Sequence, residues 1–385
     1  MKAFFRIKDW WWSKAALLMG FVYLYAAWFG ISFEKMVWLS LLSVSTIAGF
    51  ASLGYFSNDF FDREKDLLVG KRNFLLGKSP VLVFFLFTFS LLLLAWPWWY
   101  LPFNKISIAL IAAELLLFFL YAAKPFRFKE RGAAGIITDA LYAHVVPVLL
   151  SLYTFMLAAE KPFFILAVIL LLLWQTASGI RNILIHQYED ADKDRLGGIK
   201  NFAAGIPALK NLLYIKVLIT CELILSMLFF LYLTSANSLF IYCPLLLLFF
   251  TLLVLIAFYN PGISVLLQTR WKYFPNPVFE KWIPVAVLAI LSANDLRFLW
   301  FLLFHVVVFN SGFLIQSNHY FIPALIRFID LIVKGIWYKI LTPVRILFSL
   351  AVNYFIYFLL RLFKIDLKKE QTTAIDYFKK KITGK

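Results

Sequence analysis

Charged residues and cysteine are both scarce in this chain of 385 residues. Charged residues make up 15% of the sequence, against 63% for hydrophobic ones, and the mean hydropathy is +0.82. That balance excludes an ordinary soluble domain. The two cysteines, Cys221 and Cys243, lie in apolar stretches at a spacing that suits neither a disulfide framework nor a metal site. The sequence therefore predicts an integral membrane protein.

Basic residues outnumber acidic ones, and the formal net charge is +17. Nucleic-acid-binding proteins often show such an excess, but here Lys and Arg lie in short segments between apolar runs and at the termini. Trp and Tyr gather at the ends of the apolar runs, as in Trp10–Trp12, at the depth that amphipathic rings favour. We expect membrane lipids and a phosphorylated substrate as partners, and no nucleic acid.

Nine apolar segments are long enough to cross the hydrocarbon core as helices, which requires about 20 residues each. They are Ala15–Ser32, Met36–Phe56, Pro80–Tyr100, Ile106–Ala123, Ala133–Leu157, Pro162–Ile180, Leu212–Leu233, Leu239–Tyr259 and Ile283–Phe309. The predicted fold class is all-α, a polytopic membrane helical bundle of about nine transmembrane helices.

Loop charge predicts the orientation of this bundle. The N-terminus and the loops 57–79, 124–132, 181–211 and 260–282 hold almost all of the Lys and Arg. The positive-inside rule makes these segments cytosolic, and we expect a multi-pass protein of a prokaryotic inner or plasma membrane. Four crossings separate the first of these loops from the third, so both face the same side.

The last part of the chain follows a different pattern. Phe321–Leu341 is apolar but carries four charged residues, which favours an interfacial amphipathic helix. Pro343–Phe363 is a candidate tenth crossing, and a basic tail follows it. We therefore expect a transmembrane core over residues 1–310 and a membrane-associated extension over residues 311–385.

The first acidic cluster follows the second apolar segment. Asn58, Asp59, Asp62 and Asp66 are spaced by one, three and four residues, which places them along one face of a helix. Stacked carboxylates repel one another unless a divalent cation lies among them, and Mg²⁺ prefers such oxygen ligands. The alternative is a solvated acidic loop whose charge is balanced by neighbouring basic residues.

The second acidic cluster follows the sixth apolar segment. Asp190 and Asp194 share a helix face, whereas Asp192 points elsewhere if the helix persists. His186 and Gln187 lie one turn earlier, and a hydrogen-bonding role is favoured for His186 because no second His is near.

Two carboxylate clusters on one membrane face have a simple chemical use. Two Mg²⁺ ions held between them would bridge the oxygens of a diphosphate and neutralise its charge as a carbon–oxygen bond breaks. Basic residues near the clusters could assist, and the alternative for each is the positive-inside bias itself. They are Lys71, Arg72, Lys124, Arg127, Lys129 and Arg131.

These motifs resemble those of the UbiA superfamily of intramembrane prenyltransferases, which are nine-helix bundles. The family's N-D-x-x-D-x-x-x-D motif is complete from Asn58 to Asp66, and the second motif keeps Asp190 and Asp194 with Gln187 in its leading place. The segment Tyr121–Lys129 resembles the family's Tyr-x-x-Lys-Pro-x-Arg loop, and the basic, Trp-containing opening is also similar. The resemblance covers roughly residues 5–310.

The resemblance implies Mg²⁺-dependent transfer of a polyprenyl group from its diphosphate to a lipid-soluble acceptor, aromatic or lipid. The implied metal ligands, with the catalytic carboxylates among them, are Asn58, Asp59, Asp62, Asp66, Asp190 and Asp194. The implied substrate ligands are Asn58, Lys71, Arg72, Tyr121, Lys124, Arg127, Arg181 and Gln187. The chain departs from the family pattern at Gln187, in the missing Arg-Pro after the first motif and in its long C-terminal extension. The identity of the acceptor therefore stays open.

Several polar residues interrupt the apolar segments. Glu114 and Glu222 each lie in mid-membrane, where an ionised carboxylate is costly unless it faces a cavity or a partner. Either could help to position an acceptor, and either could instead be protonated or paired across helices. Asp139 and His144 are candidate acceptor ligands, although an Asp near a helix start is also favoured by the helix dipole. Asp295 and Arg297 suggest a pair or a break within the ninth segment.

Two other functions fit the same pattern. A phosphoribosyltransferase that uses a polyprenyl phosphate as acceptor is one, since the lead into the first segment and the basic pair at 71–72 resemble that branch. A non-catalytic transporter or lipid-binding protein is the other, though its carboxylates should lie deeper within the spans. A soluble all-α prenyl synthase is excluded because these helices are apolar all round.

Overall fold

The computed structural model describes residues 10–68, 70, 73–162, 164–196, 201–258 and 271–309. Within these residues the chain is helical and forms no strand. The predicted extension over residues 311–385, with its interfacial helix and tenth crossing, lies outside the described residues. So does the basic pair Lys71 and Arg72.

The predicted apolar segments correspond to helices. In chain order the helices are α2 (Ala16–Phe29), α3 (Phe33–Leu68), α4 (Pro80–Ala95), α5 (Lys105–Ala122), α6 (Ala133–Ala140), α7 (Val146–Ala159), α8 (Ile165–Leu196), α9 (Ala208–Leu233), α10 (Tyr242–Phe258), α12 (Pro275–Pro277), α13 (Ile283–Asn294) and α14 (Leu299–Val308). Wider π-helical turns precede α2, α7 and α13.

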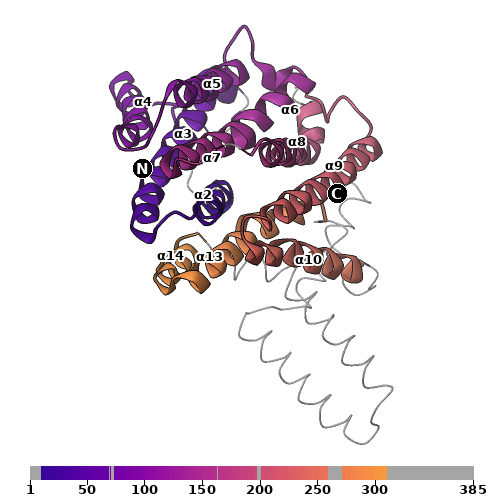
Figure 1. The fold of residues 1–385 in the computed structure, drawn as a ribbon. Coiled ribbons are helices and arrows are strands. Elements are labelled where there is room, and N and C mark those ends of the chain that lie inside the picture. Colours follow the sequence, from indigo (N-terminus) through magenta and orange to yellow (C-terminus); the bar gives the residue numbers. More distant parts are fainter. Residues whose placement is uncertain are drawn as a thin grey trace, which may run out of the picture.

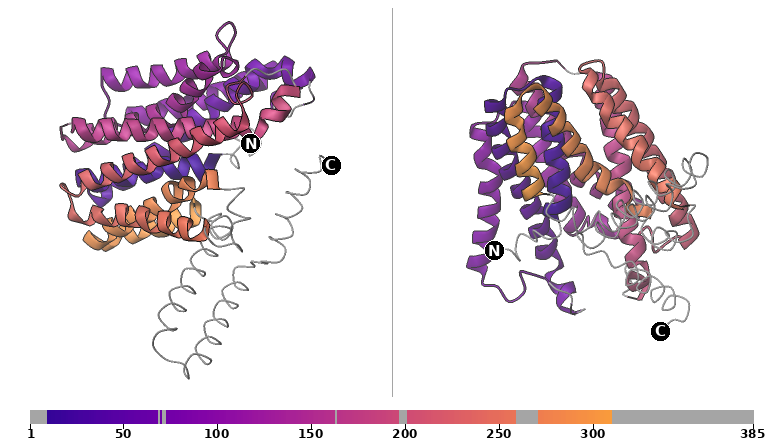
Figure 2. Two further views of the ribbon diagram at one scale, coloured as in Figure 1. Left: turned by 90° about the vertical axis from the view of Figure 1, so that its right-hand side faces the viewer. Right: turned by 90° about the horizontal axis from the view of Figure 1, so that it is seen from below.

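The helices form a membrane bundle in which the long elements run roughly parallel (Figure 2). Among the described residues, seven helices are long and apolar enough to cross a membrane, and three shorter apolar helices accompany them. In Figure 1 α4 and α5 lie on one side of the bundle, and α10, α13 and α14 on the other. Large apolar side chains are exposed on outer helices, as at Phe84 and Phe85 of α4, and suit contact with lipid.

Polar residues at the predicted boundaries start and stop these helices. Ser79 accepts a hydrogen bond from the Leu82 amide ahead of Pro80, and Asn104 forms a capping box with Ser107 at the start of α5. Gly30 closes α2 in the left-handed conformation, with φ of 67°. Hydropathy therefore sets which segments are helical, and capping residues set where each begins and ends.

The first acidic cluster is part of a helix rather than of a loop. α3 continues for twelve residues beyond Phe56, where the apolar run ends, and contains the whole motif. Close packing against α4 holds this long helix: a Cβ added at Gly49 would lie 2.5 Å from the backbone nitrogen of Leu94. The helical spacing predicted for the cluster is therefore present.

The predicted ninth span, Ile283–Phe309, is wrong as a single crossing. The chain leaves α13 at Asp295, whose carboxylate accepts hydrogen bonds from the backbone amide and guanidinium of Arg297. Arg297 also pairs with Glu34 at the start of α3. These charged groups are stable only at a polar boundary, so the apolar run divides there.

The second part of that run, α14, turns back along α2. Phe298, just before α14, packs edge-to-face on Phe33 with ring centroids 5.4 Å apart. At the other end, the Trp11 indole donates to the Val308 carbonyl at 3.1 Å. Since Trp11 and Phe33 flank opposite ends of α2, α13 and α14 form a hairpin, and the described chain returns at residue 309 to the end that holds Trp11.

Candidate active site

Asp59 and Asp66 of the first cluster are fixed by the segment that follows α3. The Asn73 amide donates to the Asp66 carboxylate at 2.8 Å and to the Asp59 carbonyl at 2.7 Å. The Phe74 amide donates to Asp59 Oδ2 at 3.1 Å. Both carboxylates are largely buried. These bonds hold the two side chains in one orientation, and an acidic loop free in solvent would lack them.

Asp62 instead faces the loop between α5 and α6. Arg127 approaches one carboxylate oxygen at 2.7 Å, and Lys129 approaches the other at 2.5 Å. The Lys129 ammonium also lies 3.4 Å from the Asn58 side-chain oxygen. The cation pair of this loop, Arg127 and Lys129, thus contacts a motif that precedes it by more than sixty residues.

Glu130 links this pair to a third cation. Its carboxylate lies 2.6 Å from Lys65 and 3.0 Å from Arg127. Three cations and two carboxylates therefore form one network with a net charge of +1, counting Lys65, Arg127 and Lys129 against Asp62 and Glu130. These cations bring positive charge next to the carboxylates of the motif, where an anionic ligand can contact it.

Burial and ion pairing shift the pKa values of Lys129, Glu130 and Arg127 in opposite directions. Burial lowers the pKa of Lys129 below its ordinary value, and Asp62 only partly opposes this effect. Burial also opposes ionisation of Glu130, but hydrogen bonds from Lys65 and Arg127 outweigh it and lower the pKa of Glu130. Arg127 behaves likewise, since its bonds to Glu130 and Asp62 outweigh burial and raise its pKa. For Glu130 and Arg127, pairing therefore favours the ionised form more than burial opposes it.

Close backbone contact fixes the cationic loop on α6. A Cβ at Gly135 would lie 2.6 Å from the Phe128 carbonyl oxygen, so only glycine allows the loop to lie this near. Arg127 itself has φ of 42°, the left-handed conformation that few residues other than glycine adopt. This geometry turns the Arg127 side chain back toward α3.

The second acidic cluster lies at the same end of the bundle. Ile136, near the start of α6, packs with Ile183, Leu184 and Ile185 of α8. The loop that precedes α6 contacts Asp62 near the end of α3, and α6 itself packs against α8. The ends of α3 and α8 therefore lie beside the same loop and helix. We call this the acidic end. Four crossings lie between the two clusters: α4, α5, α6 together with α7, and α8. Because an even number of crossings returns the chain to the side on which it started, both clusters lie at one end of the bundle.

The residues of the second cluster are held less firmly than those of the first. Asp190 lies 3.8 Å from His186 of the preceding turn, and both side chains are substantially exposed. Gln187 is buried and accepts a hydrogen bond from the Ala203 amide at 3.4 Å. Gln187 therefore fixes the segment around Ala203 to α8. The side chains of Asp192 and Asp194 lie outside the described residues.

Arg181 does not join the acidic clusters. Its guanidinium is 1% exposed and binds the Glu222 carboxylate at 2.6 Å, the Asn276 side chain at 2.6 Å and the Lys272 carbonyl at 3.1 Å. Ser178 also donates to Glu222. These bonds join α8, α9 and the segment before α13. Arg181 and Glu222 thus form an internal ion pair that positions helices, and the predicted substrate-binding role gains no support.

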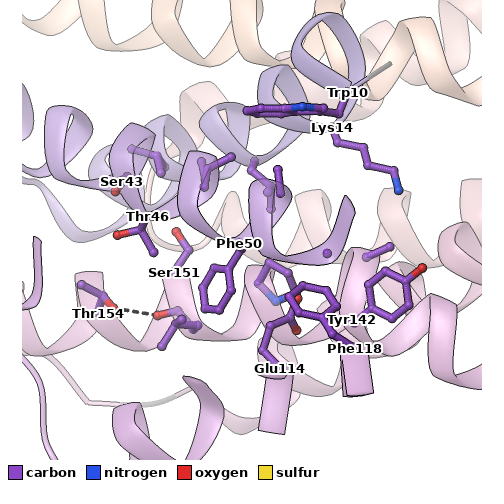
Figure 3. Close-up of a pocket in the computed structure, with 18 of the residues that line it drawn as sticks. Trp10, Lys14, Ser43, Thr46, Phe50, Glu114, Phe118, Tyr142, Ser151 and Thr154 are labelled. Atoms are coloured by element: carbon purple, nitrogen blue, oxygen red, sulfur yellow. Dashed lines mark hydrogen bonds between the residues drawn. The ribbon is translucent and has the colours of Figure 1, made fainter. Parts of the chain in front are cut away.

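A cavity leads from the acidic end into the bundle. Its wall includes Asn58 of the motif and, at the opposite end, Ser43 on the same helix. Asn58 follows Ser43 by 15 positions, which corresponds to about 22 Å of helix. Aromatic and aliphatic side chains form most of the wall, as Figure 3 shows for Phe50 and Phe118. An extended apolar chain can lie in this space with its polar head at the acidic end.

The predicted Tyr-x-x-Lys-Pro-x-Arg loop contributes unevenly to the cavity. Tyr121 lines it and packs edge-to-face on Tyr142, which donates to Asp139 at 2.5 Å. Lys124 is exposed and lies outside the cavity wall. Lys14 lines the cavity beside Trp10 and adds a cation from the other side (Figure 3). His144 is buried against Asn182 instead.

The donor set fits Mg²⁺ that arrives with a phosphorylated ligand. Among the described residues, no three His, Cys, Asp or Glu side chains converge as a preformed metal cage. Mg²⁺ commonly takes one or two carboxylates together with water and substrate phosphate oxygens, which needs no such cage. The ligands that the first motif offers are Asn58, Asp59, Asp62 and Asp66.

A sequence profile now connects this site to known proteins. The profile of the UbiA prenyltransferase family matches residues 15–272, which hold both acidic clusters, the cationic loop and most of the cavity wall. The chain belongs to this family. No curated protein sequence matches it.

Several solved structures are similar to this chain, and one of them supports the same fold. The apo structure of a UbiA homolog from Aeropyrum pernix K1 superposes with a TM-score of 0.53 at 14% identity, covering 72% of this chain and 97% of that one. A UbiA homolog from Archaeoglobus fulgidus bound to GPP and Mg²⁺ gives a TM-score of 0.46 at 16% identity, covering 72% and 96%. A digeranylgeranylglyceryl phosphate synthase gives 0.46 at 19%, covering 77% and 95%.

Sequence reasoning missed Asn73 and Glu130. Asn73 follows the motif by seven residues, and its amide orders two of the motif's carboxylates. Glu130 is the one acidic residue in a basic loop, and this local charge contrast was the available signal. Nothing in the sequence marks Asn73, because its partners become apparent only once the chain folds back along α3.

Proposed function

We propose that this UbiA-family protein is a Mg²⁺-dependent intramembrane transferase that moves a polyprenyl group from a polyprenyl diphosphate to a lipid-soluble acceptor. One observation carries the proposal: the cavity that begins at Asn58 of the acidic helix continues along α3 between apolar walls. A prenyl diphosphate would fit both regions, with its diphosphate at the polar acidic end and its prenyl chain between the apolar walls of the cavity. Loop charge supports a cytosolic acidic end.

The carboxylates of α3 and Asp190 of α8 would hold the metal. Bound Mg²⁺ supplies charge neutralisation for the diphosphate as it departs. In the reaction the bond between the first prenyl carbon and the diphosphate oxygen breaks, the diphosphate keeps the electron pair, and that carbon bonds to the acceptor, which gives up a proton. The protein's own part is to orient the diphosphate and keep water from the reacting carbon.

Arg127 and Lys129 are placed to exchange partners when substrate binds. Both now neutralise Asp62, at 2.7 and 2.5 Å. A metal ion at Asp62 would take over that role, and the two cations would become available to the phosphate oxygens. Lys14, in the π-helical turn before α2, lines the cavity and would oppose them across the diphosphate. Such fixed positive charges stabilise the leaving group more effectively in a partly buried site than in water.

Product formation tests the proposal. Purified full-length protein in lipid vesicles is supplied with a panel of prenyl diphosphates and a lipid extract, and products are identified by mass spectrometry. We expect prenylated products that disappear with EDTA and return with Mg²⁺. Asp62→Asn and Asp190→Asn should each lower the rate by at least about 100-fold. Glu64→Gln is the matched control, since Glu64 is exposed on the same helix.

Full turnover by both carboxylate variants would contradict the proposal. A labelled sugar diphosphate, supplied in parallel, separates prenyl transfer from phosphoribosyl transfer. Incorporation of the sugar label, with no prenyl transfer from any donor, would assign the same site to the alternative reaction.

A further inference from the structure

The Asp139 carboxylate, on α6, lies between the two acidic clusters. Tyr121 lies within electrostatic reach of both Asp139 and Asp62 of the first cluster. On the other side, His186, one turn before Asp190, lies within electrostatic reach of Asp139. Asp139 is half-buried and belongs to neither cluster. This carboxylate is therefore close to the diphosphate end of the cavity, where prenyl transfer would occur.

Two tyrosines of the cavity wall connect Asp139 to the cavity. The Tyr142 hydroxyl donates to Asp139 Oδ1 at 2.5 Å, and the Tyr142 ring lies in the wall beside Phe118 (Figure 3). Tyr121 packs edge-to-face on Tyr142 and lies within hydrogen-bonding reach of the same carboxylate. Both tyrosines are half-buried. A tyrosine hydroxyl donates one hydrogen and also accepts, so Tyr142 can bond to Asp139 and to a ligand in the cavity together.

Asp139 lies too far along α6 to stabilise the start of that helix. It is the seventh residue of α6, whereas the helix dipole acts within the first turn. A wider π-helical turn, Leu141–Val145, follows directly and contains Tyr142. Such turns are frequent at functional sites. Close packing fixes this part of the chain, because a Cβ added at Gly179 of α8 would lie 2.7 Å from Ala140 Cα.

We propose that Tyr142 and Asp139 form a proton relay that takes the proton released by the acceptor. The proposal rests on the proposed function, because it completes that reaction. As the acceptor atom bonds to the first prenyl carbon, its bond to hydrogen breaks, and the electron pair of that bond stays with the acceptor. The proton passes to the Tyr142 oxygen, and the Tyr142 hydrogen passes to the Asp139 carboxylate.

Charge stays balanced along this relay. Tyr142 is a neutral hydroxyl before and after the transfer, and Asp139 changes from a carboxylate to a carboxylic acid. The diphosphate leaves with the electron pair of the broken carbon–oxygen bond. The Lys14 ammonium lines the cavity within electrostatic reach of Asp139, and its charge attracts the carboxylate form. After the product leaves, Asp139 returns its proton to water through the same hydroxyl.

Asp139→Asn tests the relay, because its amide oxygen can still accept the Tyr142 hydrogen bond but the side chain cannot take the proton. Transfer from geranyl diphosphate to a lipid extract is measured with purified full-length protein in lipid vesicles. Equilibrium binding of geranyl diphosphate with Mg²⁺ is measured on the same samples. We expect kcat to fall by about 100-fold, while KM and Kd for geranyl diphosphate stay those of wild type.

Tyr142→Phe tests the other half of the relay. It removes the hydroxyl that carries the proton and keeps the ring in the cavity wall, so kcat should fall by at least about tenfold. Tyr153→Phe is the matched control. It also removes a buried hydroxyl, one that accepts a hydrogen bond from Asn104, but Tyr153 lies outside the cavity wall. Its kcat should equal that of wild type.

Full turnover in Asp139→Asn or in Tyr142→Phe would overturn the relay and would leave the departing diphosphate as the proton acceptor. A loss of activity in Asp139→Asn through a higher KM or weaker binding of geranyl diphosphate would also overturn it, since Asp139 would then be a binding or structural residue. Failure of the wild type to transfer a prenyl group from any donor would instead overturn the proposed function, and the relay with it.

Discussion

Glu114 and Glu222 occupy equivalent positions by sequence, since each lies in mid-membrane on an apolar helix, yet their surroundings differ completely. Glu222 binds Arg181 and Ser178 and joins three elements of the core. Glu114 borders a cavity, and one of its oxygens has no partner. A carboxyl within a membrane span faces either a partner or a cavity, and these two glutamates differ in that respect.

The largest expected effect concerns the paired glutamate. Glu222→Leu leaves the Arg181 guanidinium buried without its carboxylate, so the protein should lose about 3 kcal/mol of unfolding free energy. Thermal and denaturant unfolding of the purified protein measures this loss. Addition of Arg181→Met should restore most of it, because an apolar pair of similar volume replaces the ion pair. Unchanged stability in Glu222→Leu would remove the distinction between the two glutamates.

A smaller effect is expected from the hydroxyl that supports Glu222. Ser178→Ala removes one donor to the carboxylate but leaves the contacts from Arg181 in place. The loss should be about 1 kcal/mol, measured in the same unfolding experiments. A loss as large as that of Glu222→Leu would mean that Ser178, rather than Arg181, is the main partner.

The smallest effect on stability should come from the cavity glutamate. Glu114→Leu removes an unsatisfied carboxyl and breaks no hydrogen bond at Oε2, so stability should stay within about 0.5 kcal/mol of wild type or rise. The unfolding free energy checks this. A loss above about 2 kcal/mol would assign Glu114 a structural role like that of Glu222.

Much of the fold could be predicted because hydropathy dominates in a membrane. Apolar length located the helices, and the spacing of Asn58 to Asp66 placed the first cluster on one helix face, as α3 shows. The run from Ile283 to Phe309 was predicted as one span, with Asp295 and Arg297 as either a pair or a break within it, and the structure shows the break. Their contact with Glu34, which fixes them at the bundle's end, depends on a distant helix.

The site was predicted less completely than the fold. Local motifs identified Asp62, Arg127 and Asn58, which the structure brings together. Arg181 was predicted as a substrate ligand from the family resemblance, and in the structure its guanidinium pairs with Glu222 of the next helix. Glu114 and Glu222 could not be told apart, since the difference lies in which neighbouring helix offers a cation.

Equilibrium binding of geranyl diphosphate to purified wild type and Asp62→Asn, each with Mg²⁺ and with EDTA, tests the central claim most directly. Wild type should bind at least about tenfold more tightly with Mg²⁺. In Asp62→Asn that gain should vanish, while binding in EDTA should equal or exceed that of wild type, because Arg127 and Lys129 no longer neutralise a carboxylate. The same gain from Mg²⁺ in both proteins would contradict the account.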